Sequence, residues 1–453
     1  MSRLIHKAKK AFKSKFDSES KTLLRNSSWV FIASGYGALL AFLRSVIIAR
    51  SLGAELLGTF TIAIAFVLIT QELLRLNFSM GLIKYGAEFK TENRIDKLVA
   101  LIKGCIYGSL ASAALSIIVI TGIVFFAYDR FIQTPGLNYF IIFYAMVNGF
   151  AFIDAISKST LKLYFKFKIN SIISMVMDTI EFIIVATTII LFPKNLGYFF
   201  TAVIVTKLIN SLICNAAAFY ELRKELGMYL SSRLELIKDH FRVIGNFVVG
   251  NSLSSTLKVF MNQGDVLLLG AISGPAQVGF YSVAKKLAYS LLTITDPLVT
   301  SIFPQLSVLI AKKQYAETKK MLYKITRITI IPSVIFLVLS YFLKDFIILK
   351  IYGKEFIYAA KPFFYLLTGA IQGSIFFWVL PLIQSLGLTT MRLRVYLIAI
   401  LLGATASYLL VPHYHATGVA IGLLIANIYI TTRFIYVANK KIIEQEQILA
   451  KAN

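Results

Sequence analysis

Charged side chains are scarce in this sequence of 453 residues. Asp, Glu, Lys and Arg make up 15% of it, whereas hydrophobic residues make up 57%. So few polar side chains cannot cover the surface of a water-soluble protein of this size. The composition therefore excludes an ordinary soluble fold and indicates a membrane protein.

Cysteine is almost absent as well. Cys105 and Cys214 are the only two, and both lie in apolar stretches far apart in the chain. Two isolated cysteines cannot form a zinc-type cluster, and the four histidines show no convergent pattern with acidic residues. We therefore expect no metal site and no cofactor.

Acidic residues are also few, 22 against 47 basic ones, which gives a formal net charge of +25. In a soluble protein this excess would suggest binding to nucleic acid. Here the basic residues lie in short segments between apolar runs. We expect no nucleic-acid partner, and the charges serve instead to orient the chain in a membrane.

What the sequence does contain is a series of apolar stretches of roughly 20 residues, the length that crosses ~30 Å of hydrocarbon. Twelve such stretches are predicted, near residues 27–52, 57–80, 98–126, 138–157, 169–192, 196–219, 242–269, 279–305, 325–348, 363–386, 395–412 and 414–437. The pattern predicts an all-α integral membrane protein with about twelve transmembrane helices.

The basic residues lie mostly on the side of the membrane that holds the N-terminus, which by the positive-inside rule is the cytoplasm. The opposite side receives only Arg50, Arg130, Lys194, Lys350, Lys354 and Lys361. With an even number of spans, both termini are predicted to be cytoplasmic. Residues 1–25 are basic, and their apolar side chains recur at helical spacing, which favours an amphipathic helix on the membrane surface over a cleaved signal peptide.

A charged segment in the middle of the chain predicts two halves. The expected order is a cytoplasmic segment (1–25), a six-helix bundle (26–220), a cytoplasmic linker (221–241), a second six-helix bundle (242–437) and a cytoplasmic tail (438–453). Because both halves begin on the same side, a pseudo-twofold axis along the membrane normal can relate them. A weak repeat supports this, since Gly53 and Gly58 match Gly270 and Gly279.

Three motifs in order carry a resemblance to a known family. They are FLRSVIIARSLGAELLGTF at 42–60, QGDVLLLGAISGPAQVGFYSVA at 263–284 and IYGKEFIYAA at 351–360. Together they resemble the polysaccharide (O-antigen, Wzx-like) flippases of the multidrug/oligosaccharidyl-lipid/polysaccharide exporter (MOP) superfamily. The resemblance implies a MATE-like fold. The first motif is also similar to the first span of the related lipid II flippase, where an arginine and then an aspartate line the cavity; Arg44 matches that arginine, but Ser45 replaces the aspartate.

Cations within the spans are the candidate substrate-binding residues. A cation at the centre of the bilayer costs roughly 2.5 to 3.5 kcal/mol, so it requires a partner or a wet cavity. Arg44 is the first candidate, and Lys258, Lys285 and Lys286 are the others. Neighbouring residues on a helix point ~100° apart, so the sequence leaves open which of Lys285 and Lys286 faces the cavity.

Acidic residues within the spans form a second group. Asp178 and Glu181 share one helical face, and Lys207 of the next span is expected to reach them. Asp265 lies two turns after Lys258 on one face. Two interpretations stay open for this group: a buried charge network, or coupling to protons or sodium.

Two further spacings carry structural predictions. Glu72 and Arg75 are three residues apart and are expected to form an ion pair. Asp296 precedes Pro297 within the predicted span 279–305, and a proline inside a helix permits a bend, so this pair is a candidate hinge.

The resemblance implies a flippase that moves an undecaprenyl-pyrophosphate-linked oligosaccharide across a bacterial inner membrane by alternating access, with no catalytic residue. Membrane lipids and polysaccharide polymerase or other assembly proteins are its expected partners. A cation-coupled multidrug exporter of the same superfamily is one alternative. A polysaccharide polymerase or ligase is another, although such enzymes usually need larger outer loops. The glycan, the coupling ion and the oligomeric state are not readable from the sequence.

Overall fold

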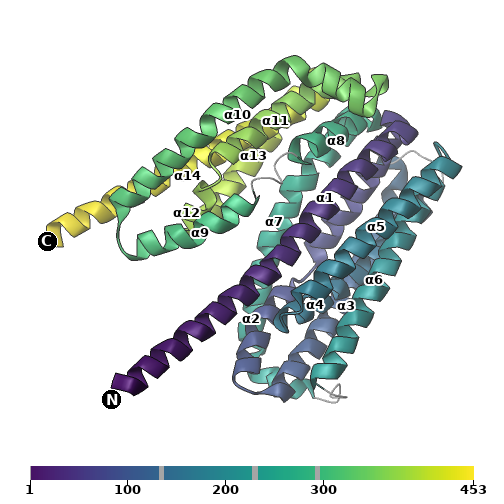
Figure 1. Cartoon of the computed structure of the whole chain (residues 1–453). Coiled ribbons are helices and arrows are strands. Elements are labelled where there is room, and N and C mark those ends of the chain that lie inside the picture. The colour runs from purple at the N-terminus through teal and green to yellow at the C-terminus, as the bar shows by residue number, and fades with distance from the viewer. Residues whose placement is uncertain (1, 132–136, 227–232, 291–295, 453) are drawn as a thin grey trace.

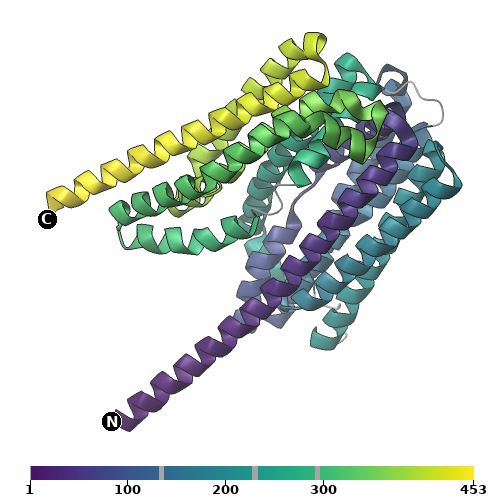
Figure 2. The same cartoon turned by 45° about the horizontal axis from the view of Figure 1, so that its top comes forward.

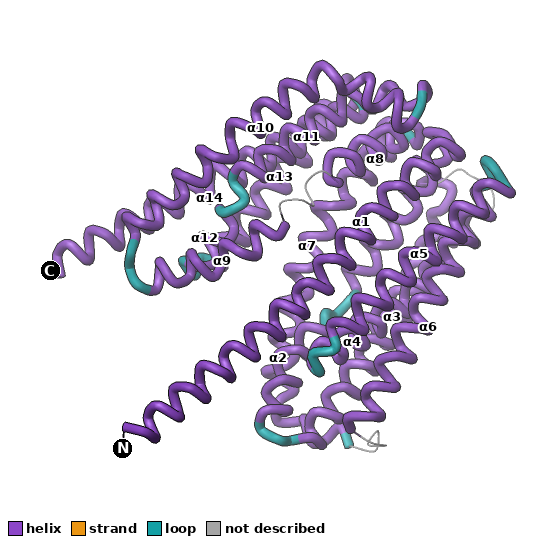
Figure 3. The backbone as a smooth tube through the Cα atoms, viewed as in Figure 1, coloured by secondary structure: helices purple, strands orange, loops and turns teal. Residues whose placement is uncertain are grey.

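The computed structural model describes residues 2–131, 137–226, 233–290 and 296–452, and every regular element within those ranges is helical (Figure 3). The first half of the chain holds α1 (Ser2–Leu74), α2 (Phe78–Thr91), α3 (Ile95–Phe131), α4 (Leu137–Leu163), α5 (Phe167–Leu191) and α6 (Leu196–Leu226). The second half begins with the 3-10 helix η1 (Leu234–His240) and continues through α7 (Phe241–Ser273), α8 (Pro275–Ser290), α9 (Asp296–Ala311), α10 (Tyr315–Tyr352), the 3-10 helix η3 (Lys354–Ala359), α11 (Ala360–Ile375), α12 (Val379–Ser385), α13 (Thr389–Tyr414) and α14 (Ala416–Ala452). The predicted all-α class is confirmed.

These helices make a multi-pass membrane protein. Within the described residues, seven helices are long and apolar enough to cross a membrane, and α11 with α12 forms an eighth as a pair bent by 46°. α1 counts once among them but holds two spans, because Gly53 breaks it. The predicted spans 242–269, 279–305 and 325–348 fall on α7, on α8 with α9, and on α10. The predicted span 57–80 covers the second part of α1 and the start of α2.

The two halves repeat one sharp turn. Gly53 has φ 75° and ψ 177°, and Gly274, between α7 and α8, has φ 80° and ψ 177°. L-residues avoid this backbone region because their Cβ clashes, so only glycine adopts it without strain. In both halves a second glycine, Gly58 or Gly279, follows five residues later. The match of Gly53 with Gly270 was therefore wrong: the counterpart is Gly274, because α7 continues to Ser273.

The two turns cross each other. A Cβ on Gly58 would collide with the carbonyl oxygen of Pro275, and a Cβ on Gly279 would collide with that of Ala54. Ala54 and Pro275 each directly follow the turn glycine of their own half, so the contact is reciprocal, as a twofold axis requires. Backbone meets backbone here, and this close packing explains why the first two motifs carry their glycines.

Hydrogen bonds across the halves close this end of the molecule. Arg50 donates from Nε to the carbonyl oxygen of Ile351 at 2.7 Å and from Nη2 to that of Lys350 at 2.6 Å. The carboxylate of Glu355, in η3, accepts the backbone N–H of Ala54 at 2.7 Å. The third motif therefore holds the α1 turn against the end of α10. From this end the two groups of helices diverge towards the chain termini (Figures 1 and 2).

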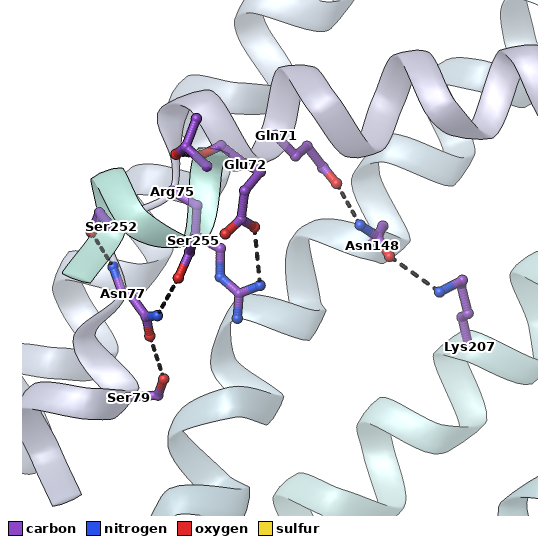
Figure 4. A network of polar contacts seen from close by, with 10 residues as sticks. Gln71, Glu72, Arg75, Asn77, Ser79, Asn148, Lys207, Ser252 and Ser255 are labelled. Atoms are coloured by element: carbon purple, nitrogen blue, oxygen red, sulfur yellow. Dashed lines mark hydrogen bonds and ion pairs between the residues drawn. The ribbon is translucent and has the colours of Figure 1, made fainter. Parts of the chain in front are cut away.

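The helix α7 links the two groups at their other end. Ser252 and Ser255 of α7 accept hydrogen bonds from the backbone N–H and the side-chain amide of Asn77 at 2.8 and 3.0 Å, just before α2 (Figure 4). Thr256 donates to the carbonyl oxygen of Glu72 at 3.0 Å. The first part of α7 thus packs on the first half of the chain, although it belongs to the second in sequence.

The predicted hinge directly follows residues 291–295, which lie outside the described residues. α8 is described to Ser290 and α9 from Asp296, so a bend at Pro297 is not tested and the hinge stays a prediction. The side chains of Asp296 and Pro297 lie outside the described residues. So do the side chains of residues 1–27, and the predicted amphipathic surface segment stays a prediction, although residues 2–27 continue α1.

Candidate functional site

Arg44 of α1 forms an ion pair with Glu181 of α5. Its Nη1 lies 2.6 Å from Oε2 of Glu181, and the two side chains are 23% and 28% exposed. Arg44 is nine residues before the turn at Gly53, or roughly 13 Å along the helix at 1.5 Å per residue. The Arg44–Glu181 ion pair is therefore partly exposed, and it lies well inside the apolar helix α1.

The pair depends on close packing between α1 and α5. A Cβ on Gly37 would collide with Oδ2 of Asp178, so the absence of a side chain lets this carboxylate approach α1. The hydroxyls of Tyr36 and Thr179 lie 2.7 Å apart and share a hydrogen bond. These contacts fix the register in which Glu181 meets Arg44.

Ser45 lies beside Arg44 but carries no charge. Its hydroxyl donates to the carbonyl oxygen of Phe42 at 2.7 Å and lies 3.5 Å from the hydroxyl of Tyr352. The carboxylate that accompanies Arg44 is thus supplied by a different helix, α5, and sequence spacing around Arg44 gives no sign of it.

Lys207 of α6 lies in a chain of polar contacts rather than against the α5 carboxylates. Its ammonium donates to Oδ1 of Asn148 at 3.2 Å, and the Asn148 amide donates to Oε1 of Gln71 at 2.5 Å (Figure 4). Gln71 in turn donates to the carbonyl oxygen of Ala145 at 2.8 Å. The predicted contact of Lys207 with Asp178 and Glu181 is not formed, although the charge of Glu181 still acts on Lys207.

A buried carboxylate that the sequence analysis missed lies between α4 and α6. Oδ1 of Asp154 accepts hydrogen bonds from Ser211 at 2.6 Å and from Asn215 at 2.9 Å. Ser157 donates to the Asn215 amide oxygen at 2.6 Å. The sequence does contain a signal for this contact. Asp154 is a single acidic residue in an apolar span, and Ser211 and Asn215 lie four residues apart on another span.

Within its described residues, the second half holds a buried ion pair at about the same distance from its turn as Arg44, since Asp265 lies nine residues before Gly274. Lys285 of α8 lies 2.6 Å from Oδ2 of Asp265 and also donates to the carbonyl oxygen of Asn262 at 2.6 Å. The hydroxyl of Tyr281 donates to the same Asp265 oxygen. Asp265 is therefore partnered by Lys285 and not by Lys258, which has no carboxylate within ion-pair distance among the described residues.

Lys286 differs from its neighbour. It is exposed, no acid within the described part of the chain pairs with it, and its charge is close enough to Arg44 for the two to repel each other. Lys258 is exposed as well. The expected pair of Glu72 and Arg75 is confirmed, with Oε2 and Nη1 3.6 Å apart.

Taken together, Lys207 of α6 and Lys286 of α8 lie within electrostatic range of Arg44, and of these three cations only Arg44 has a carboxylate in direct contact among the described residues. Such an arrangement can hold an anionic group. Within the described ranges, no group of three or more His, Cys, Asp or Glu side chains could hold a metal ion.

Comparison with solved structures shows the fold. An inward-facing MATE-family multidrug resistance transporter of the MOP superfamily is 14% identical, with a TM-score of 0.65 over 90% of this chain and 96% of that one. The inward closed form of lipid II flippase MurJ is 15% identical, with a TM-score of 0.66 over 92% of this chain and 89% of that one. A MOP-superfamily transporter from Pyrococcus furiosus is 12% identical, with a TM-score of 0.58 over 94% and 96%.

These likenesses confirm the predicted MATE-like architecture. No curated protein matches the sequence. Residues 23–310, however, match the family described as polysaccharide biosynthesis protein, and they include both glycine turns, Arg44 and its partner Glu181. The three motifs and this match over most of the chain agree: the protein belongs to the polysaccharide biosynthesis protein family.

Proposed function

We propose that the protein is a flippase that moves an undecaprenyl-pyrophosphate-linked oligosaccharide, such as an O-antigen unit, from the cytoplasmic to the outer leaflet of a bacterial inner membrane. The observation that carries the proposal is a half-buried arginine, Arg44, in the first span of a chain of this family. Lys286 lies within electrostatic range of it. The proposal implies transport without a covalent step, and hence no catalytic residue.

The chemistry of the headgroup supports this substrate class. A pyrophosphate carries several negative charges and presents oxygens that match the planar fork of a guanidinium. Fixed cations at membrane depth compensate for the water that the headgroup leaves behind. The lipid tail needs no such site, because it can stay in the bilayer between helices.

The cations divide into two roles in this proposal. Arg44 and Lys286 contact the headgroup, and Lys258, which is also exposed, assists. Lys285 is held by Asp265 and the carbonyl of Asn262, so it supports the α7–α8 turn instead. Asp178, Glu181 and Lys207 form a charge network around Arg44.

Alternating access is the proposed mechanism. The hydrogen bonds of Arg50 and Glu355 hold the end with the glycine turns closed, and the helices diverge towards the termini. With both termini cytoplasmic, this is an inward-facing state into which the headgroup enters from the cytoplasm. Opening of the glycine-turn end releases it outside, where polymerase and other assembly proteins act on it.

The test is export in a complementation assay for the surface glycan, with Arg44→Ala, Arg44→Lys and Arg75→Ala at matched membrane levels. Arg44→Ala is expected to abolish export, Arg44→Lys to retain part of it because the charge remains, and Arg75→Ala to retain most because Arg75 is paired within its own helix. Full export by Arg44→Ala would remove Arg44 from the mechanism and the proposal with it.

A further inference from the structure

Arg44 is already neutralised before any substrate arrives. Its guanidinium lies 2.6 Å from the Glu181 carboxylate, and Asp178 lies one helical turn before Glu181 on the same helix, close enough to interact with Arg44 electrostatically. An anionic headgroup therefore has to compete with a carboxylate that the protein itself supplies. This differs from a site that simply offers a free cation.

The geometry allows that competition to take place. Both side chains are about a quarter exposed, so Glu181 can leave Arg44 without becoming a buried, unpaired charge. Lys207 lies within electrostatic reach of Glu181, and its only hydrogen bond within the described part of the chain goes to the neutral amide of Asn148. A released Glu181 thus stays near a second cation.

The incoming group brings its own negative charge to this competition. A carboxylate carries one negative charge, a phosphate monoester between one and two, and a pyrophosphate monoester more, with additional oxygens for the guanidinium. Each of these anions must displace Glu181 to reach the guanidinium, so each pays the same cost of breaking the pair. The paired Arg44 therefore binds any of them less tightly than an arginine without its carboxylate would.

We propose that Glu181 is an internal counter-ion that the headgroup displaces from Arg44, and that it thereby keeps the site from holding anionic lipids tightly. This rests on the proposed function and adds the group that limits affinity at the same site. Glu181 acts through Arg44 and need not touch the substrate. Its return to Arg44 also assists release of the headgroup.

The experiment measures equilibrium binding of farnesyl pyrophosphate and farnesyl monophosphate to the purified full chain in nanodiscs of neutral phosphatidylcholine. Glu181→Gln is expected to strengthen the binding of both ligands by roughly tenfold, the low end of the range for a charged hydrogen bond. The pyrophosphate should bind more tightly than the monophosphate in both proteins, because it carries more charge.

Matched variants separate this role from a structural one. Glu72→Gln removes the carboxylate that pairs with Arg75 and should leave both dissociation constants unchanged. Glu181→Asp keeps the charge and should restore the wild-type affinities even if Glu181→Gln lowers the yield of folded protein. Arg44→Ala should weaken both ligands, and Arg44→Ala combined with Glu181→Gln should match Arg44→Ala alone, because Glu181 acts only through Arg44.

Two results would overturn the idea, and they differ. Unchanged dissociation constants in Glu181→Gln, while Arg44→Ala still weakens binding, would reject the counter-ion exchange and leave the flippase proposal intact. No binding of either ligand by the wild type or any variant would reject the anionic-lipid site itself, and the exchange with it.

Discussion

The two halves of the molecule share a turn but not a charge pattern. Gly53 and Gly274 have nearly the same φ and ψ, and each is followed five residues later by a glycine that meets the backbone of the other half. The first half surrounds its cations with Glu181, Asn148 and other polar groups of α4, α5 and α6. The described residues of the second half hold a buried ion pair between Asp265 and Lys285, which has no such polar surroundings from other helices.

Backbone packing explains why the glycines are shared between the halves while the charged residues differ. Where backbone meets backbone no side chain fits, so both halves keep glycine at equivalent positions. Charged groups a few turns away are under no such constraint, and they differ between the halves. We infer that the turn is the shared mechanical part and that substrate recognition lies mainly in the first half.

The largest expected effect follows from breaking the shared turn. Gly279→Ala places a Cβ against the carbonyl of Ala54, and Gly58→Ala places one against the carbonyl of Pro275. Because the obstacle is backbone, the helices must separate, and we expect a loss of about 3 kcal/mol in stability or no folded protein. Gly122→Ala is the control, since a Cβ there meets nothing within 4 Å. Thermal unfolding in detergent measures the effect; equal melting temperatures for all three variants would contradict the crossing.

A smaller effect is expected from the ion pair of the second half. Lys285→Met leaves the Asp265 carboxylate, 5% exposed, with the Tyr281 hydroxyl but without a cation. Removing one partner of a fully buried pair costs roughly 3 kcal/mol, and because the Lys285 side chain is 20% exposed we expect about 2 kcal/mol here. Lys285→Met combined with Asp265→Asn should recover part of that loss, because no charge is then left unpaired. A double variant no more stable than Lys285→Met would show that the pair is not what the turn depends on.

The order of helices could be predicted because apolar length alone defines a span. The twelve predicted stretches fall on helices of the structure, and the glycines at 53, 58 and 279 were placed at the turns. Gly270 was matched in place of Gly274 because a residue type does not reveal φ and ψ.

The site was less predictable, for a physical reason. The spacing rules of a helix identify neighbours on one face, which is why the pair of Glu72 and Arg75 was found. Contacts between helices depend on the rotation of each helix about its axis, which the sequence does not fix. Glu181 was therefore assigned towards Lys207 and not Arg44, and Asp265 towards Lys258 and not Lys285.

The cations of the second half offer a sharper test of where recognition lies. Lys286→Gln is expected to lower glycan export severalfold without a change in melting temperature, because Lys286 is exposed and adds to the field around Arg44. Lys258→Gln should lower export less, and Arg433→Gln, an exposed cation of α14, should serve as the unaffected control. Export is compared at matched membrane levels. An effect of Lys258→Gln larger than that of Lys286→Gln would move the recognition site towards α7.

The smallest expected effect concerns how the two turns are held. The carboxylate of Glu355, from the second half, accepts the N–H of Ala54 at the first turn, whereas Ser273 at the second turn contacts His415 of its own half at 3.2 Å. Only the first turn is thus held across the halves by a charged group. Glu355→Gln keeps the shape but removes the charge, a change of about 1 kcal/mol, or roughly fivefold in the ratio of closed to open states.

That shift can be measured from outside the cell. Cys105 and Cys214 are both buried, so a single introduced thiol gives a specific signal. Leu57→Cys places it in the closed end, where Leu57 is 8% exposed. A membrane-impermeant maleimide should label it severalfold faster in Glu355→Gln than in the parent, with Lys354→Gln as the neighbouring control. Equal labelling rates would mean that the glycine crossing alone keeps this end closed, and that the two turns are mechanically equivalent after all.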